Sequence, residues 1–262
     1  MDILNENLRL SIIMSDPFTV IAFYYDEVME KVDYEEWARY IRSLFQMAPL
    51  KPIRKVLDLA MGTGTLSILM QKMGFDVYGL DFSTGMLKVA QSKFKKTGYV
   101  PSLVKADFRD IPFKNSSFDG VFSTFDSLNN ILDPLELERV FREVRRILKK
   151  GGAFVFDLNT EWSLKEEWDN KTRVEETTNT ISIWKSRYIN GISYLYFTLL
   201  VRESANSDLY KKVFTVFRER GYDPPEVRKL LKRSGFTKVF CFDHFTLNPG
   251  KSKNSRVTYL AF

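Results

Sequence analysis

Short apolar runs alternate with helix-like stretches between residues 54 and 158, and this alternation constrains the fold more than any other feature of the sequence. Runs of strand type lie at residues 54–60, 75–80, 102–106, 119–125 and 153–158, and amphipathic helical patterns lie at 65–72, 84–96 and 134–149. Strands that alternate with helices form parallel sheets, because each helix returns the chain across one face. The sequence therefore predicts an α/β protein whose mostly parallel sheet carries helices on both faces.

The pattern changes in residues 159–221, where β-branched and aromatic residues predominate. The dipeptide Asn190-Gly191 separates an apolar run at 181–188 from another at 192–201, and it is the strongest short-range hairpin signal. A third run, at 209–217, follows a polar turn. These runs predict a small antiparallel β-sheet inserted into the parallel fold.

Neither face of this inserted sheet has a polar pattern. In the central run, one side is expected to carry Leu195, Phe197 and Leu199, and the other Tyr194, Tyr196 and Leu200. The sequence leaves open whether the sheet is a lid over a substrate, packs on its own domain, or forms a homodimer interface.

A helical pattern resumes after the insertion, with Asp223 as a suitable N-cap and Pro224 in the first turn. Two last strand-like runs, 238–246 and 256–262, predict an antiparallel C-terminal edge for the sheet. At 262 residues the chain is long for a single domain of about 150 residues. We expect one domain made of residues 1–158, with a helical segment at 1–50, and 222–262, interrupted by an inserted subdomain at 159–221.

Composition excludes several classes of protein. Hydrophobic residues make up 44% and charged residues 27%, as in an ordinary folded chain. The longest uncharged stretch, 188–201, is too short for a spanning helix, which needs about 20 apolar residues. The first residues lack the pattern of a secretory signal, so we expect a cytoplasmic protein without a membrane partner. The only cysteine is Cys241 and the only histidine is His244, which excludes an intramolecular disulfide and disfavours a zinc site.

The chain is basic, with 39 Lys and Arg against 33 Asp and Glu, or a net charge of +6. A basic chain favours polyanionic partners. The cations are spread over several helix-like faces instead of forming one patch. Nucleic acid is therefore left open as a partner but is not favoured.

A glycine-rich turn joins the first strand to the first helix in residues 56–64, Val-Leu-Asp-Leu-Ala-Met-Gly-Thr-Gly. Glycine tolerates positive φ and has no side chain, so such a turn lets a ligand approach the backbone. A nicotinamide or flavin site would need a third glycine where Ser67 stands and would not use an acid before the turn. Asp58 instead suits a ligand that carries an ammonium group.

With the residues that follow it, this loop resembles that of the class I S-adenosylmethionine-dependent methyltransferases, whose first motif is an acid followed by three alternating glycines. Asp81 follows the second strand, Asp107-Phe108 follows the third, Phe-Asp-Gly-Val at 118–121 opens the fourth, and Lys-Lys-Gly-Gly at 149–152 precedes the fifth. Residues 222–262 resemble the final helix and hairpin of the family. The resemblance implies a Rossmann-like fold, S-adenosyl-L-methionine as cofactor, S-adenosyl-L-homocysteine as product, and no metal.

The resemblance also implies roles for single residues. An acid after the second strand binds the ribose hydroxyls and an acid after the third binds the adenine amino group, which assigns Asp81 and Asp107; Ala60 replaces the first glycine. An aromatic residue of the N-terminal leader closes over the sulfonium, where a ring face gains cation–π attraction. The cofactor residues expected are Tyr25, Trp37, Asp58, Ala60, Gly62, Gly64, Asp81, Phe82, Asp107, Phe108, Ser123 and Phe125.

Purely structural roles stay open for several of these residues. Asp81 would also suit the cap of the next helix, and Asp107 the end of a strand. Tyr25 and Trp37 would also suit an aromatic stripe that packs on the core.

Residues after the fourth strand are the best candidates for the acceptor site, because ligands bind at the carboxyl ends of parallel strands. Asp126 and Asn129 are expected to act there, although Asp126 would also suit a helix cap. His244 is the third candidate, as a base or a substrate contact. The Asn/Asp-Pro-Pro-aromatic motif of nucleic-acid amino methyltransferases and the Pro-Cys of cytosine C5 enzymes are absent here.

The sequence favours methyl transfer to a small-molecule acceptor by in-line displacement. One alternative is an RNA or protein methyltransferase that uses the basic surface. Another is a cofactor-binding module without catalysis, whose insertion serves oligomerisation.

We expect Asp81→Ala to weaken S-adenosylmethionine binding by roughly 1.5 to 3 kcal/mol, the usual scale for hydrogen bonds to a charged group. Calorimetric titration of the variant and the wild type measures this difference. An unchanged affinity would remove Asp81 from the site.

Overall fold

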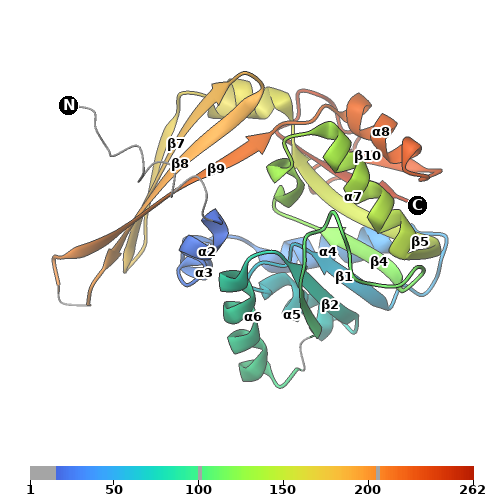
Figure 1. Ribbon diagram of the computed structural model, residues 1–262, viewed down its shortest axis with the longest axis horizontal. Coiled ribbons are helices and arrows are strands. Elements are labelled where there is room, and N and C mark those ends of the chain that lie inside the picture. The colour runs from blue at the N-terminus through green and yellow to red at the C-terminus, as the bar shows by residue number, and fades with distance from the viewer. Residues whose placement is uncertain (1–15, 100–101, 205–206) are drawn as a thin grey trace.

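The structure is a computed structural model that describes residues 16–99, 102–204 and 207–262. The first six residues, used above to exclude a signal, and part of the polar turn before residue 209 lie outside the described residues. Figure 1 shows two sheets, one flanked by helices and one projecting away from it. Within the described ranges, no helix is long and apolar enough to cross a membrane.

The larger sheet, sheet A, has seven strands in the order β10-β11-β5-β4-β1-β2-β3. Its strands are β1 (Lys55–Leu59), β2 (Asp76–Asp81), β3 (Ser102–Lys105), β4 (Phe118–Ser123), β5 (Leu148–Asn159), β10 (Val239–Asp243) and β11 (Arg256–Ala261). The pairs among β1 to β5 are parallel, whereas β11 pairs antiparallel with both β5 and β10. The predicted α/β fold class is confirmed.

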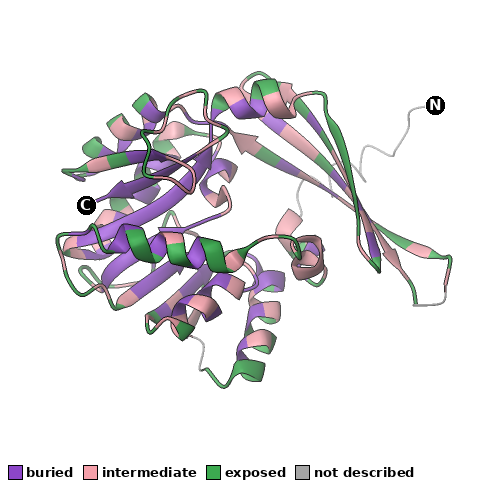
Figure 2. Cartoon of the chain, turned by 180° about the vertical axis from the view of Figure 1, so that it is seen from behind, coloured by how far each residue is buried: buried purple, intermediate pink, exposed green. Residues whose placement is uncertain are grey.

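Helices cover both faces of sheet A, as expected. They are α4 (Tyr34–Phe45), α5 (Thr65–Lys72), α6 (Thr84–Thr97), α7 (Pro134–Ile147) and α8 (Pro224–Arg233). Successive residues of a strand point to opposite faces. In β1, Val56 therefore packs with the core cluster of α4 and α5, and Leu57 with that of α7 and α8. Figure 2 shows that the strands of sheet A are buried between these layers.

The predicted boundary between the helix at 134–149 and the strand at 153–158 is wrong. The helix expected at 134–149 ends at Ile147, and β5 begins directly at Leu148 instead of at residue 153. Leu148 pairs with Phe118, and the register then shifts so that Gly120 faces Ala153. The predicted turn at 149–152 is thus an irregularity within a longer strand, where Gly151 takes a φ of 77°.

The smaller sheet, sheet B, is antiparallel, and its strands are β6 (Thr172–Glu176), β7 (Thr180–Ile189), β8 (Ile192–Arg202) and β9 (Tyr210–Arg220), in that order. The predicted hairpin is confirmed, since Ile189 faces Ile192 across Asn190 and Gly191, whose φ values of 51° and 85° suit a two-residue turn. Strand β6 was not predicted. Its residues Thr-Arg-Val-Glu-Glu are all exposed and carry one apolar side chain, so they lack strand patterning.

One face of sheet B packs on the N-terminal leader, the short helices α2 (Pro17–Ile21) and α3 (Tyr25–Val28). Phe197, Leu199 and Phe217 form a buried cluster with Ile21 of α2 and Met86 of α6. Exposed residues gather toward the outer end of sheet B (Figure 2). The face that carries Leu195, Phe197 and Leu199 therefore covers part of the same chain.

The turn after β4 joins the two sheets through Asn129, which lies in the 3₁₀ helix η1 (Ser127–Asn130) and is fully buried. Its side-chain oxygen accepts from the Asn159 backbone N–H at 3.0 Å. Its amide nitrogen donates to the backbone carbonyls of Asn159 at 3.0 Å and Arg220 at 2.6 Å. The ends of β5 and β9 are thus held to the same side chain.

We expect Asn129→Ala to lower the free energy of unfolding by about 3 kcal/mol, because three hydrogen bonds to the backbone of Asn159 and Arg220 are lost. Urea unfolding of both proteins measures this loss. Asn130→Ala is the matched control: the Asn130 amide makes one local bond, to the Ser127 carbonyl, and its loss should cost less than about 1 kcal/mol. Equal losses in the two variants would contradict the assigned role of Asn129.

Candidate functional site

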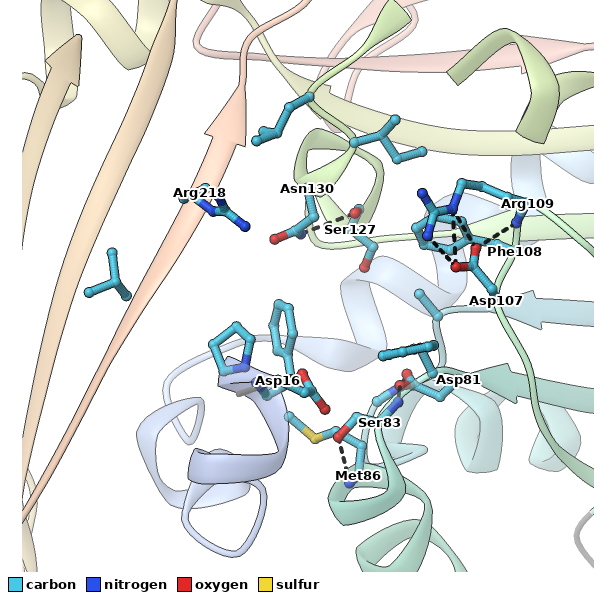
Figure 3. A pocket seen from close by; sticks show the side chains of 18 of the residues that line it. Asp16, Asp81, Ser83, Met86, Asp107, Phe108, Arg109, Ser127, Asn130 and Arg218 are labelled. Carbon is cyan, nitrogen blue, oxygen red and sulfur yellow. Dashed lines mark hydrogen bonds and ion pairs between the residues drawn. The ribbon is translucent and has the colours of Figure 1, made fainter. Parts of the chain in front are cut away.

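A cavity of about 930 Å³ lies between sheet B and the carboxyl ends of β1, β2 and the chain after β3. This volume is at the upper end of the roughly 300–1,000 Å³ typical of small-molecule sites. Of the residues predicted to bind a cofactor, seven line it: Tyr25, Ala60, Gly62, Asp81, Phe82, Asp107 and Phe108. Figure 3 shows the side chains that surround it.

The loop after β1 leaves room for a ligand at Gly62. Ala60, Gly62 and Gly64 all have positive φ, at 67°, 56° and 76°. A Cβ added at Gly62 would meet nothing within 4 Å, whereas at Gly64 it would come within 3.0 Å of Met61 and Phe94. Gly62 therefore exposes its backbone to the cavity, and Gly64 permits packing below it. Ala60 adopts a left-handed conformation that favours glycine.

Asp81 holds this loop to the next helix. Its carboxylate accepts the backbone N–H groups of Gly62 at 2.7 Å and Ser83 at 2.8 Å, and burial raises its pKa. The cap of α6 is the Ser83 side chain, which accepts from the Met86 N–H, so the alternative role of Asp81 as that cap is not what the structure shows. Asp81 lines the cavity with a carboxylate suited to accept further hydrogen bonds from a ligand.

Asp107 is fixed by Arg109, whose side-chain Nε lies 2.9 Å and 3.0 Å from its two oxygens. This hydrogen bonding holds the pKa of Asp107 below its usual value. Arg109 also lies 3.5 Å from Glu136. The neighbouring ring of Phe108 lines the same part of the cavity, so an acceptor group and an aromatic surface stand together.

Asp58 lies beneath the loop and does not line the cavity. It is 2% exposed, and one of its oxygens accepts from the Ser67 hydroxyl at 2.6 Å. Burial raises the pKa of Asp58 to about 7, partly offset by that hydrogen bond. A cationic group above the loop would favour its ionised form.

Tyr25 reaches the cavity from the leader, and the next residue, Asp26, holds the leader in place. Asp26 accepts from the Thr63 hydroxyl at 2.6 Å and pairs with Lys93 of α6 at 2.8 Å. At the other end of the leader, the Thr19 and Ser83 hydroxyls lie 2.7 Å apart. Burial raises the pKa of the Tyr25 phenol well above its ordinary value, so the phenol stays protonated.

Trp37 does not line the cavity. It is 6% exposed on α4 and packs its ring against Phe125 at 4.4 Å, His244 at 4.6 Å and Phe245 at 5.0 Å between centroids. This is the packing role that the sequence had left open for it. Ser123 is also buried away from the cavity.

The three candidate catalytic residues are placed outside the cavity lining. Asp126 has a φ of 52° and is held by Asn159 at 2.7 Å and Arg256 at 3.2 Å. Asn129 uses its amide atoms on backbone groups, as described above. His244 bonds to the Thr258 hydroxyl at 2.8 Å, and burial lowers its pKa to about 3, so it stays neutral at physiological pH. Their catalytic assignment stays a prediction.

Sequence analysis did not predict the remaining residues that line the cavity. They come from the leader (Asp16, Pro17, Phe18), from α6 and its cap (Ser83, Met86), from the segment after β3 (Arg109), from η1 to α7 (Ser127, Asn130, Ile131, Leu132, Asp133, Glu136) and from sheet B (Tyr194, Tyr196, Val216, Arg218). The alternation in residues 192–201 predicted that Tyr194 and Tyr196 share a face. It did not indicate which face meets the cavity.

The cavity suits the cofactor that the sequence resemblance implied. Gly62 offers open space against the backbone, Asp81 and Asp107 offer carboxylate acceptors, and Phe108 offers a ring. Among the described residues, no cluster of His, Cys, Asp and Glu could hold a metal ion.

Comparisons with known proteins show that the chain is similar to methyltransferases. A family model described as a methyltransferase domain matches residues 56–152. The chain is 28% identical over 247 residues to a putative methyltransferase, YqeM, of Bacillus subtilis, covering 92% of this chain and 94% of that protein. It is 26% identical over 223 residues to a demethylmenaquinone methyltransferase of Paenarthrobacter aurescens, covering 85% and 78%. The crystal structure of an S-adenosylmethionine-dependent methyltransferase from Clostridium acetobutylicum superposes with a TM-score of 0.79 at 26% identity, over 91% and 95% of the two chains.

We expect Asp58→Asn to stabilise the protein progressively as the pH rises. The wild-type carboxyl has a pKa of about 7 when folded against 3.8 in the unfolded chain, so its favourable contribution is complete below about pH 4 and is lost as the pH rises through 7. Since asparagine does not ionise, the variant should gain up to about 4 kcal/mol over the wild type above that pH. Urea unfolding at pH 4 and pH 8.5 measures the gain.

Ser67→Ala tests the same carboxyl, because it should increase the loss of stability with pH that Asp58→Asn removes. Its hydroxyl favours the ionised form of Asp58, so its removal should steepen the loss of stability with pH. A difference between Asp58→Asn and the wild type that is the same at both pH values would contradict the elevated pKa.

Proposed function

Because the chain belongs to the class I S-adenosylmethionine-dependent methyltransferases, we propose that it methylates a small-molecule acceptor by in-line displacement. The observation that carries this proposal is the single cavity that joins the cofactor residues to side chains of sheet B. An acceptor held against sheet B would share this cavity with the cofactor. The similarity to a demethylmenaquinone methyltransferase, whose name indicates a small-molecule acceptor, supports the same class.

The cofactor end of the cavity is built by the strand tips. The Asp81 carboxylate would accept the ribose hydroxyls, and Asp107 with Phe108 would hold the adenine by a hydrogen bond and by ring contact. The open backbone at Gly62 gives the amino-acid portion access to the loop, with Asp58 beneath it as counter-charge. When bound, S-adenosylmethionine supplies an electrophilic methyl group on a sulfonium.

The chain would act mainly by positioning the two reactants and by excluding water from them. In-line displacement requires the acceptor atom, the methyl carbon and the sulfur to be collinear, and holding two reactants in that geometry accounts for much of the acceleration. Tyr25 stands on the leader that the Asp26–Lys93 pair clamps over the loop, and its protonated hydroxyl can orient an acceptor as a donor. Sheet B forms one wall of the cavity, and an acceptor bound against it would displace water from the reacting groups.

The site needs a general base for only some classes of acceptor. A base is needed only when the acceptor atom still carries its proton as the methyl group arrives. An amine that enters in its neutral form needs none before transfer. The protonated phenol of Tyr25 would act as a hydrogen-bond donor, so its part is orientation.

The acceptor class can be tested with S-adenosylmethionine labelled in its methyl group. The protein is incubated separately with the metabolite, RNA and protein fractions of a cell extract. We expect label in the metabolite fraction, because the acceptor has to fit within the cavity. Labelled RNA or labelled protein without labelled metabolites would contradict the proposal.

The Asp81→Ala variant is the control for this assay. Its weakened cofactor binding should reduce labelling of the true acceptor fraction, whereas label that does not depend on the cofactor site would persist. Label that is equal in variant and wild type does not come from this active site.

A further inference from the structure

Two cations line the cavity, Arg109 and Arg218, and their surroundings differ. Arg109 pairs with Asp107 and with Glu136. In the described part of the chain, Arg218 makes neither an ion pair nor a side-chain hydrogen bond. In Figure 3 its guanidinium extends from β9 into the space in front of Asn130.

The acids of the cavity wall are already engaged elsewhere. Asp16 caps α2 through the N–H groups of Phe18 and Thr19, and Asp133 caps α7. Asp81 accepts two backbone N–H groups, and Asp107 and Glu136 face Arg109, as described above. The charge of Arg218 is therefore left without a neutralising partner among the described cavity residues.

The register of sheet B places ring surface beside this charge. Tyr194 lies opposite Arg218, and Tyr196 lies opposite Val216, so all four side chains share the face that lines the cavity. The other face is occupied by the packing of Phe197 and Phe217 on the leader. The two tyrosines are thus turned toward the cavity by the packing of the residues between them.

The facing wall, from η1 to α7, carries two aliphatic side chains among polar ones. Ile131 and Leu132 follow η1 and line the cavity, with the amide of Asn130 at their edge. The acceptor end of the cavity therefore combines two tyrosine rings, two aliphatic side chains and one unneutralised guanidinium. The rings and the aliphatic side chains suit a flat or apolar body, and Arg218 suits an anionic substituent.

We propose that Arg218 binds an anionic group, a carboxylate or a phosphate, on the methyl acceptor. This inference rests on the proposed function, since it assigns the acceptor end of the same cavity. Guanidinium suits either anion because its planar N–H groups bind two oxygens at once. Arg218 is exposed without a ligand, and an acceptor that covers it would strengthen the contact by removing water.

The test uses three probes with one ring system: 1-naphthyl phosphate, 1-naphthoate and neutral 1-naphthol. Calorimetry measures their binding to the protein loaded with S-adenosylhomocysteine. Arg218→Met removes the charge and keeps the apolar stem, and Arg218→Lys restores the charge. Lys212→Met is the matched control, because Lys212 is exposed on the same face of β9 but does not line the cavity.

We expect at least one anionic probe to bind the wild type at least tenfold more tightly than 1-naphthol does. Arg218→Met should abolish this preference, Arg218→Lys should retain part of it, and Lys212→Met should leave it unchanged. A preference for phosphate and a preference for carboxylate both support the proposal, and they identify the anion.

The proposal is overturned if Arg218→Met retains the preference, if 1-naphthol binds the wild type as tightly as both anions, or if no probe binds the loaded protein. Affinity for S-adenosylhomocysteine is measured in each variant. If the wild type binds S-adenosylhomocysteine normally but shows no preference for an anionic probe, only the assignment of Arg218 is refuted. If the wild type does not bind S-adenosylhomocysteine, the proposed function itself is refuted.

Discussion

A partly buried network of charged and amide side chains joins the ends of β4, β5, β9 and β11, and the shape of the cavity depends on it. Asn159 donates to Asp126 at 2.7 Å and to Glu219 at 3.3 Å, so its amide links the turn after β4 to sheet B. Arg256 contacts Asp126 at 3.2 Å and Asp157 at 2.6 Å. The network fixes the last residues of β9, and Arg218 precedes Glu219 by one position.

The charges in this network do not balance if all its acids ionise. Asp126, Asp157 and Glu219 are three carboxyls around one guanidinium, that of Arg256. Burial raises the pKa of both Asp157 and Glu219 above the ordinary values of a carboxyl, which favours a protonated acid in this cluster. A protonated carboxyl lets the cluster stay buried at a smaller electrostatic cost. The left-handed backbone at Phe125 and Asp126 is held by the same contacts.

The leader completes the cavity by a separate set of polar contacts. Asp26 ties α3 to the glycine-rich loop and to α6, and Glu27 accepts from the Thr177 hydroxyl of sheet B at 2.8 Å. The absence of a side chain at Gly85 lets α2 approach α6, since a Cβ there would lie 3.0 Å from the Thr19 backbone. Three parts of the chain that are distant in sequence therefore enclose one site.

The sequence by itself determined the alternating strands and helices, the inserted antiparallel sheet with its turn at Asn190-Gly191, and the strand-tip residues Ala60, Gly62, Asp81 and Asp107 that line the cavity. These features are local, because periodicity, glycine and acid spacing act over a few residues. Only the tertiary structure decided which face of sheet B meets the cavity, that the rings of Trp37 and His244 pack together, and that Arg218 pairs with no acid among the described residues. Side-chain alternation defines the two faces of a strand but does not indicate what covers each face. Whether an arginine is neutralised depends on acids from distant segments, and here the acids of the leader and of α7 cap their own helices.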